Sequence, residues 1–452
     1  MRKTNITLLF SGLAVFILGC IQGCIEEYPI QTNQQSILDA SNTLVVEADV
    51  SDMIRTQEIV LSRVADFTND SVVSFDIEDP NTYLFPGQEL KPRPVLYEEG
   101  ANVRIADDTG WEVRFFEGTP GHYYSESSFG AQPQRSYQLK ITLKNGQKVN
   151  SSWEQLSVAS SLTAVEPRSV NDPELGEGIG FFVSAQSNTA DGAYLRYSFE
   201  ETFKVIAPLW NPQDFVLREY DPCADPVEYS LELVNRDQEE QVCYRTLASQ
   251  EIMLASTKSL NSGLLQDVRV HFIPKDDFKI AHRYSLLIRQ HTLSLGGYLF
   301  YENLRNFSQQ ETVFSQIQPG AIQGNLSADN PSELFVIGYF SVSGLSESRL
   351  FLNYADYFPD APEPPFVVPC SLRSSPESHA SRCPEVPVQG GGTLCPLSII
   401  ELLDLGDIIR YAGPYQEGMV SICPGPYSYV PRVCGDCTVL GSNVAPLFWI
   451  DE

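Results

Sequence analysis

The sequence predicts a mainly β protein with two β domains, and three observations support this. Apolar and polar residues alternate over short stretches such as 137–143, which is typical of half-buried strands. Turn-forming residues separate these stretches, as at 107–110 and 145–146. The chain is 42% hydrophobic and 11% aromatic, so it can build real cores. Only two stretches favour helices.

The N-terminus has the pattern of a secretory signal. Arg2 and Lys3 precede an apolar run over 6–18, and small residues lie before two cysteines, in Gly19-Cys20 and Gly23-Cys24. The run is shorter than the roughly 20 apolar residues needed to span a bilayer. We therefore favour a cleaved signal peptide over a transmembrane anchor.

A cysteine directly after such a run indicates a lipoprotein, because two acyl chains on its thiol give stable membrane anchoring. We favour Cys24, which is followed by Ile25-Glu26-Glu27, with Cys20 as the alternative. Acidic residues at this place resemble the surface-export signal of Bacteroidota lipoproteins. The sequence thus predicts a signal peptide over 1–23, a polar tether over 24–40 and a surface-exposed, lipid-anchored protein of the bacterial outer membrane. Without acylation, the protein would be periplasmic or secreted.

Length and charge narrow the class further. Removing residues 1–23 from the 452-residue chain leaves 429, which is long for a single domain. The removed segment holds two basic residues and no acidic one, so the net charge changes from −28 to −30. This charge argues against nucleic-acid binding and against adhesion to an anionic membrane surface. We favour solubility over the binding of cationic ligands as its explanation.

Eight further cysteines in an oxidising compartment predict disulfides. They are Cys223, Cys243, Cys370, Cys383, Cys395, Cys423, Cys434 and Cys437. Their grouping suggests a Cys223–Cys243 bridge and three bridges among the last six, for which fifteen pairings are possible. The Cys434–Cys437 motif has two alternatives, a redox-active pair or a zinc site. A redox pair needs a thioredoxin-like setting, and the remaining cysteine spacing fits zinc poorly.

The first domain is predicted over 41–160 as a β-sandwich. Asp107-Asp108-Thr109-Gly110 and Asn145-Gly146 are expected to form the turns of two hairpins. A proline-containing polar stretch over 66–95 predicts a loop. Strands are expected at 44–48, 58–62, 103–105, 111–115, 137–143 and 148–149.

The second domain, over 161–452, is also predicted to be mostly β. A helix is expected after Ser294, which can cap it, because Tyr298, Tyr301, Leu304 and Phe307 recur at helical spacing. Strands are expected at 193–203, 268–272, 283–289 and 334–342, a second short helix at 397–405, and a cysteine-stapled loop at 358–395.

A search for catalytic and metal-binding motifs predicts no catalytic residue, no metal site and no cofactor. No metalloprotease, hydrolase-elbow, phosphate-loop or dinucleotide motif is present. The histidines, none of which pair at metal-ligand spacing, are His122, His271, His282, His291 and His379.

Two pairs of adjacent acidic residues are candidates for a site, and neither fits one. Asp107 and Asp108 supply too few oxygens for calcium, and turn chemistry suffices to explain them. Glu200 and Glu201 are adjacent in a predicted strand, so their side chains should point to opposite faces. That arrangement is poor for a catalytic acid and base.

Several ordered motifs together resemble a Bacteroidota family of outer-membrane lipoproteins known only by a domain of unknown function. The motifs are Cys24-Ile-Glu-Glu-Tyr-Pro29, Leu44-Val-Val-Glu47, Asn102-Val-Arg-Ile-Ala-Asp-Asp-Thr-Gly110, Pro120-Gly-His-Tyr123, Tyr194-Leu-Arg-Tyr-Ser-Phe-Glu-Glu-Thr202, Gly324-Asn-Leu326, Gly338-Tyr-Phe340, Cys434-Gly-Asp-Cys-Thr438 and Pro446-Leu-Phe-Trp449. They extend over nearly the whole mature chain. The tail departs from the family pattern at Gly441, which lacks a second glycine, and at Ala445, where a basic residue is usual.

The resemblance implies that the N-terminal sandwich is immunoglobulin-like or carboxypeptidase-regulatory-like. It also implies that the gene often lies beside that of a TonB-dependent outer-membrane receptor, which makes such a receptor the hypothesised partner, and it supplies no catalytic residue. We therefore expect a non-enzymatic accessory or substrate-capture lipoprotein whose ligand the sequence does not identify. The alternatives are a surface hydrolase acting on peptides or glycans, and a structural or adhesive surface protein.

Overall fold

The computed structural model of the protein describes residues 42–63, 95–260, 262–308, 324–378, 397–406, 408–417 and 424–451. Strands dominate these residues, with three short α-helices among them, so the mainly β prediction is confirmed. The predicted signal peptide, the tether, both candidate lipidation sites Cys20 and Cys24, and nearly all of the loop predicted at 66–95 lie outside the described residues.

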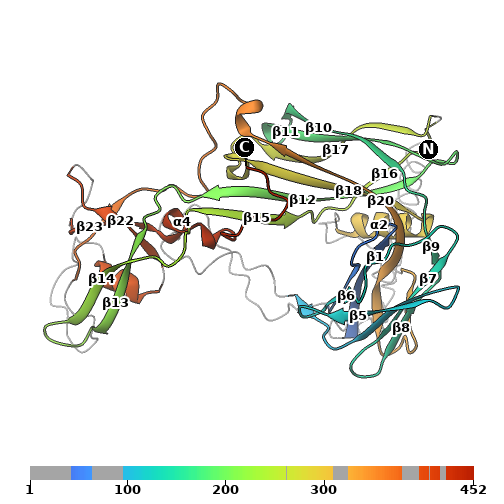
Figure 1. The fold of residues 1–452 in the computed structure, drawn as a ribbon, viewed down its shortest axis with the longest axis horizontal. Helices are drawn as coiled ribbons and strands as arrows, with labels where there is room; N and C mark the ends of the chain where they lie inside the picture. The colour runs from blue at the N-terminus through green and yellow to red at the C-terminus, as the bar shows by residue number, and fades with distance from the viewer. Residues whose placement is uncertain are drawn as a thin grey trace, which may run out of the picture.

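The described residues form four parts, which we call the rolled sheet, the central sheet, the cover sheet and the cysteine lobe. Figure 1 shows the rolled sheet at the lower right and the cysteine lobe at the left, with the central and cover sheets stacked above the rolled sheet. The rolled and central sheets are continuous, because β1 of the first pairs with β20, which belongs to both.

The rolled sheet follows the order β20-β1-β2-β6-β5-β4-β7-β8-β19, and β19 returns to contact β20. Both predicted hairpins are confirmed, because β4 pairs with β5 and β7 with β8. Its strands are β1 (Thr43–Ser51), β2 (Glu58–Arg63), β3 (Leu96–Tyr97), β4 (Asn102–Asp107), β5 (Glu112–Glu117), β6 (His122–Ser125), β7 (Ser136–Thr142), β8 (Lys148–Ser151), β9 (Glu154–Gln155), β19 (Leu326–Ala328) and the first half of β20 (Phe335–Leu352).

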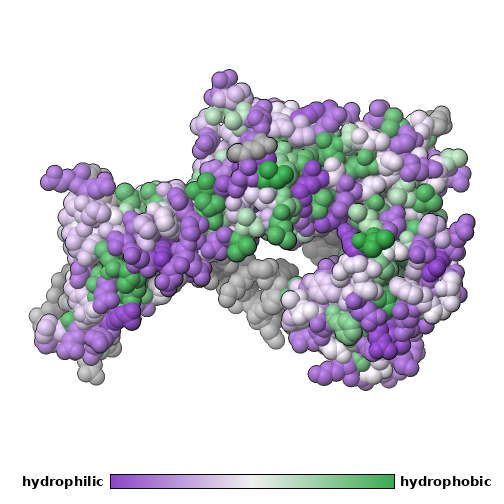
Figure 2. Space-filling view, in the orientation of Figure 1, coloured by the Kyte–Doolittle hydropathy of each residue, from purple (hydrophilic) through white to green (hydrophobic). Residues whose placement is uncertain are grey.

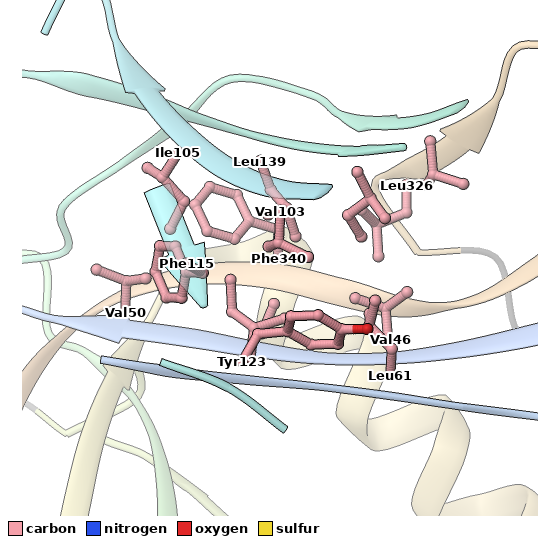
Figure 3. Packing of buried hydrophobic residues seen from close by; sticks show 14 of the residues in the cluster. Val46, Val50, Leu61, Val103, Ile105, Phe115, Tyr123, Leu139, Leu326 and Phe340 are labelled. Carbon is pink, nitrogen blue, oxygen red and sulfur yellow. The ribbon is translucent and has the colours of Figure 1, made fainter. Parts of the chain in front are cut away.

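Alternation along the strands builds the core of the rolled sheet. In β7, Tyr137, Leu139 and Ile141 are buried while the residues between them are partly exposed. Figure 3 shows such side chains from opposite layers facing one another. Leu326 and Phe340 join this core, although they lie far beyond residue 160 in the chain. Each fully buried side chain of this size contributes about 1.5–3 kcal/mol.

The central sheet packs face to face on the three-stranded cover sheet. Phe181 and Val183 of the cover sheet share a buried core with Leu286 and Ile288 of the central sheet. The central strands are β12 (Tyr194–Ile206), β15 (Val242–Ala248), β16 (Met253–Ser256), β18 (Tyr284–Leu293) and the second half of β20. The cover strands are β10 (Ser161–Asp172), β11 (Gly176–Gln186) and β17 (Leu264–Pro274), and the short helices η3 (Phe278–Ile280) and η5 (Tyr354–Asp356) lie nearby in the sequence.

The long strand β20 joins the two sheets. Residues 335–343 pair in parallel with β1, and residues 344–352 pair antiparallel with β18. The parallel half approaches β1 closely at Gly338, where φ is +155° and a Cβ would lie 2.3 Å from the carbonyl oxygen of Val46. Only glycine fits this position.

Helix α2 (Leu295–Ser308) confirms the predicted helix. The Ser294 hydroxyl accepts a hydrogen bond from the Gly297 amide at 3.2 Å, as an N-cap residue does. Phe300 is buried against the partly buried Tyr301 and Leu304, and the helix contacts β12, β18 and β20. Neither α2 nor any other helix of the described residues has the length and apolar character required to cross a membrane.

The cysteine lobe has a small core of its own. Phe215, Tyr411 and Tyr429 pack there with Ile399 and Leu402 of the second predicted helix. That helix begins with a capping box between Ser398 and Glu401. The elements are β13 (Gln213–Asp221), β14 (Glu228–Asn235), β21 (Arg373–Ser374), α3 (Ile399–Asp404), β22 (Ile409–Pro414), β23 (Tyr427–Pro431), α4 (Arg432–Gly435) and η6 (Cys437–Val439).

Candidate functional site

A cluster of polar side chains lies where the rolled sheet meets the central sheet. We call it the junction cluster, and it consists of Asp49 on β1, Arg196 on β12, His291 on β18 and Ser343 on β20. The Arg196 guanidinium contacts Asp49 Oδ2, and His291 Nδ1 lies 3.2 Å from the same oxygen. The Ser343 hydroxyl donates to Asp49 Oδ1 at 2.9 Å. Four strands from both sheets thus share one carboxylate.

Burial sets the protonation states of this cluster. Burial alone would raise the pKa of Asp49, but the His291 ring, Arg196 and the Ser343 hydroxyl more than compensate and hold the pKa below its ordinary value. Burial lowers the pKa of His291 to about 4, against the attraction of Asp49. At neutral pH the cluster therefore holds a neutral imidazole beside a carboxylate–guanidinium pair.

The junction cluster has the composition of a hydrolytic triad but not its geometry. In a triad, one imidazole nitrogen faces the serine and the other faces the carboxylate. Here Ser343 Oγ and Asp49 Oδ2 both approach Nδ1 of His291, at 3.1 and 3.2 Å. Ser343 is also completely buried, which leaves no room for a substrate. The cluster therefore acts as a structural connection between the two sheets.

An open pocket lies beside the junction cluster, and we call it the junction pocket. Its volume is about 470 Å³. It has walls from β1, β2, β12, α2, β20 and the segment 249–252. Pockets of this size commonly hold small molecules. Its charged and aromatic lining side chains include Glu47, Asp49, Glu58, Arg196, Glu251, Phe300, Tyr301 and Tyr339.

Helix α2 supplies an aromatic wall to this pocket. The Tyr301 ring lies under the Arg196 guanidinium, with the central carbon 4.4 Å from the ring centroid. Phe300 packs against Tyr301 and Tyr339, with centroids 5.3 and 5.7 Å apart. The Tyr339 hydroxyl donates to Glu154 at 2.7 Å, which fixes that ring. The wall is thus formed before any ligand arrives.

A second polar cluster faces the cover sheet. Glu201 accepts hydrogen bonds from Lys279 Nζ at 3.0 Å and from the Tyr284 hydroxyl at 2.9 Å. Burial opposes ionisation, but His271 and Lys279 outweigh it and lower the pKa of Glu201 to about 2. His271 lies between the rings of Phe181 and Phe199, at 5.5 and 4.1 Å. Because Glu201 stays ionised at neutral pH, it is no proton donor there.

The structure confirms the side-chain placement predicted for both acidic pairs. Glu200 contacts Arg289 and Arg349, whereas Glu201 contacts Lys279, so the two point to opposite faces as predicted. Asp107 Oδ1 accepts bonds from the Thr109 and Trp111 amides, as turn chemistry predicts. Over the described ranges, no three His, Cys, Asp or Glu side chains are placed to hold a metal ion.

Sequence reasoning did not single out Asp49, Arg196 or Ser343, and it passed over His291. One signal was available, since Asp49 and His291 are ionisable residues inside otherwise buried strands. Such residues require partners, because an unpaired buried charge is costly. Arg196 lies within the motif 194–202 but was not given a role. The pairing itself depends on contacts between residues far apart in the sequence.

Comparison with known proteins places the chain in a family. Residues 25–349 match the domain of unknown function DUF4249. The chain belongs to this family. The DUF4249 match covers all strands of the rolled, cover and central sheets except the last three residues of β20, and it ends before most of the cysteine lobe.

No curated protein matches the chain. A solved structure with a weak match is that of the Yersinia pseudotuberculosis adhesin InvE, at 13% sequence identity and a TM-score of 0.14. The match covers 55% of this chain and 55% of that one, so the chain spans little more than half the length of that structure. Likeness at this level carries no conclusion for the DUF4249 protein.

The disulfides correct one prediction. Cys243 is bonded to Cys437, and Cys370 to Cys434, so the predicted Cys223–Cys243 bridge and a closed set among the last six cysteines are both wrong. The reason is spatial, because β15 carries Cys243 to η6 at the base of the cysteine lobe. Cys223 is also disulfide-bonded. The remaining candidates Cys383, Cys395 and Cys423 lie outside the described residues.

The Cys434-Gly-Asp-Cys437 motif, beyond the DUF4249 match, is structural. Its two cysteines bind different partners, so they form neither a redox pair with each other nor a zinc site. Between them, Asp436 accepts from Arg410 and Arg432, each at 2.9 Å. A Cβ at Gly435 would lie 2.8 Å from Cβ of Arg410, so glycine permits this approach.

The C-terminal motif Pro446–Trp449 packs on the central sheet. Trp449 contacts Tyr244 and Phe351, with ring centroids 5.0 and 5.8 Å apart. The Arg349 guanidinium lies 3.5 Å from the centroid of the Phe448 ring. These contacts give the tail a structural role. Gly441 contributes to it, because a Cβ there would lie 2.5 Å from the carbonyl oxygen of Tyr244.

Proposed function

We propose that this DUF4249 protein is a non-catalytic, ligand-binding lipoprotein of the bacterial outer surface that acts beside a TonB-dependent receptor. The observation that carries the proposal is the pairing of two features at one place. The open junction pocket of about 470 Å³ has a preformed aromatic wall, and the neighbouring Ser343–His291–Asp49 cluster is locked in a geometry that serves packing. The place therefore suits binding better than bond cleavage.

The location and the partner are supported by the sequence. A signal-like segment ends at Cys24, and the acidic residues after it resemble a surface-export signal. The motifs resemble those of Bacteroidota lipoproteins that accompany TonB-dependent receptors. The net charge of −28 is compatible with an exposed soluble part, and Figure 2 shows hydrophilic residues over most of one face of the molecule.

The test is affinity purification of the tagged native protein from solubilised outer membranes, followed by mass spectrometry. We expect a TonB-dependent receptor to co-purify with it. Recovery of the lipoprotein without any such receptor would contradict the partnership and leave free-standing binding, adhesion or hydrolysis to be examined.

A matched pair of variants tests the anchor in the same experiment. Cys24→Ala should remove the protein from the membrane fraction and abolish receptor capture, because the acylated thiol is lost. Cys20→Ala should leave both unchanged. If Cys20→Ala instead releases the protein and Cys24→Ala does not, Cys20 is the lipidated residue. If both variants stay in the membrane fraction, the anchor does not depend on either cysteine alone.

A further inference from the structure

The junction pocket is lined by more negative than positive side chains. Glu47, Asp49, Glu58 and Glu251 line it, whereas Arg196 is the one Lys or Arg side chain among the described residues of the lining. Asp49 is neutralised by Arg196, and Glu58 lies 2.8 Å from Nδ1 of His122. Because one guanidinium faces four carboxylates, the described lining stays net negative.

Glu47 and Glu251 are both exposed, and within the described ranges neither takes part in an ion pair. They lie on different elements, β1 and the segment after β15, so two separate parts of the chain each supply a carboxylate to the lining. Such a site attracts positive ligands and repels negative ones.

The aromatic wall also favours a positively charged ligand. The Tyr301 ring already holds the Arg196 guanidinium at 4.4 Å, so it lies in a cation–π contact within the protein itself. Phe300 and Tyr339 continue this wall beside the pocket. Aromatic faces bind ammonium and guanidinium groups because the ring face carries negative charge density.

A metal ion is the less suitable occupant. Hard metal cations need several oxygen ligands converging on one point. The part of the chain that the structure describes has no group of three acidic, histidine or cysteine side chains with this arrangement. The volume of about 470 Å³ is also far larger than a single ion requires. An organic cation satisfies both the glutamates and the rings.

We propose that the junction pocket binds an organic cation, an ammonium or guanidinium group carried on a small apolar body. This inference rests on the binding function proposed above and specifies its ligand class. It assigns the charge recognition to Glu47 and Glu251 and the apolar contact to the aromatic wall of Phe300, Tyr301 and Tyr339.

Titration calorimetry tests the proposal with choline and agmatine as cationic probes and dimethylbutanol, the neutral carbon isostere of choline, as the matched control. We expect choline to bind at least about tenfold more tightly than its isostere, which corresponds to about 1.4 kcal/mol. Its affinity should fall as salt rises, since exposed charges are screened. Absence of saturable binding of both cations, or equal binding of choline and isostere, would overturn the proposal.

Two double variants locate the charge. Glu47→Gln with Glu251→Gln should weaken choline binding about five- to twentyfold, by the same affinity arithmetic. Glu99→Gln with Glu126→Gln removes the same charge at exposed positions outside the pocket and should change binding less than about twofold. Equal effects of the two would refute the assignment, and thermal melting checks that both are folded. Receptor co-purification without cation binding would refute only this ligand class.

Discussion

Two regions of this molecule connect distant parts of the chain by different chemistry. At the junction cluster, Asp49 and Arg196 join β1 to β12 through an ion pair, with His291 beside them. In the cysteine lobe, Cys243 and Cys437 are 194 residues apart and are joined covalently. The ion pair depends on the protonation states of its side chains, whereas the disulfide depends on oxidation. Acid can therefore weaken the junction cluster while the disulfide stays intact, and a reducing agent can break the disulfide while the ion pair stays intact.

The largest effect is expected from the covalent connection. Replacing Cys243 and Cys437 together by alanine should lower the free energy of unfolding by up to about 5 kcal/mol, because the bond closes a very long loop. Denaturant unfolding would measure this. The matched double variant at Cys370 and Cys434, which are 64 residues apart, should lose somewhat less. No loss in either variant would mean that neither of these two bonds contributes to the stability of the lobe.

A slightly smaller loss is expected at the junction cluster. Arg196→Ala leaves Asp49 partly buried without its guanidinium and should cost about 3 kcal/mol. Thermal unfolding in the presence and absence of reducing agent would separate it from the disulfides. The control is Arg168→Ala, which removes an exposed ion pair to Asp267 and should cost less than about 1 kcal/mol. Similar losses for the two variants would contradict the structural role of the junction cluster.

As the pH falls, the junction cluster should be destabilised before the second polar cluster, which surrounds Glu201. The folded pKa of His291 is about 4, below its ordinary 6.5, so the unfolded chain takes up the proton first and stability falls between these values by up to about 3 kcal/mol. Glu201, with a folded pKa of about 2, loses its contribution only below about 4.5. Unfolding measured against pH would show both steps, and His291→Gln should remove the upper one. An unchanged profile in that variant would contradict the assignment.

The smallest effect concerns Gly435 in the cysteine lobe. Gly435→Ala places a methyl group 2.8 Å from Cβ of Arg410 and should cost about 1–2 kcal/mol through displacement of that side chain. Gly110→Ala is a useful contrast, because nothing lies near its Cβ and the cost there comes from φ of +89° alone. Calorimetric melting of both would distinguish crowding from backbone strain.

Local features of the fold were predictable from sequence, whereas its connections were not. The hairpins at Asp107–Gly110 and Asn145-Gly146, and the helix after Ser294, depend on neighbouring residues. The parallel pairing of β1 with β20 depends on residues nearly three hundred positions apart, as does the contact between Asp49 and Ser343. Alternation of apolar and polar residues shows which face of a strand is buried, but it does not show which other strand pairs with it.

The same limit explains the candidate site. The junction pocket takes its walls from β1, β2, β12, α2, β20 and the segment 249–252, and in the sequence these look like ordinary strands, a helix and a loop. The cysteines illustrate it again, because grouping by sequence distance placed Cys243 with Cys223, whereas the fold places it with Cys437. A site made by converging elements is found only when their order in space is known.

The shared strand β20 has a mechanical consequence. Because β1 and the first half of β20 run in the same direction over nine paired positions, Thr43 with Phe335 through Ser51 with Ser343, a pull on the start of β1 against the end of β20 acts along both strands. The load is then spread over all the hydrogen bonds of this pairing at once, instead of opening them one after another. If the protein is held by residues before β1 and force is applied to the central sheet, the β1–β20 pairing should therefore resist separation strongly.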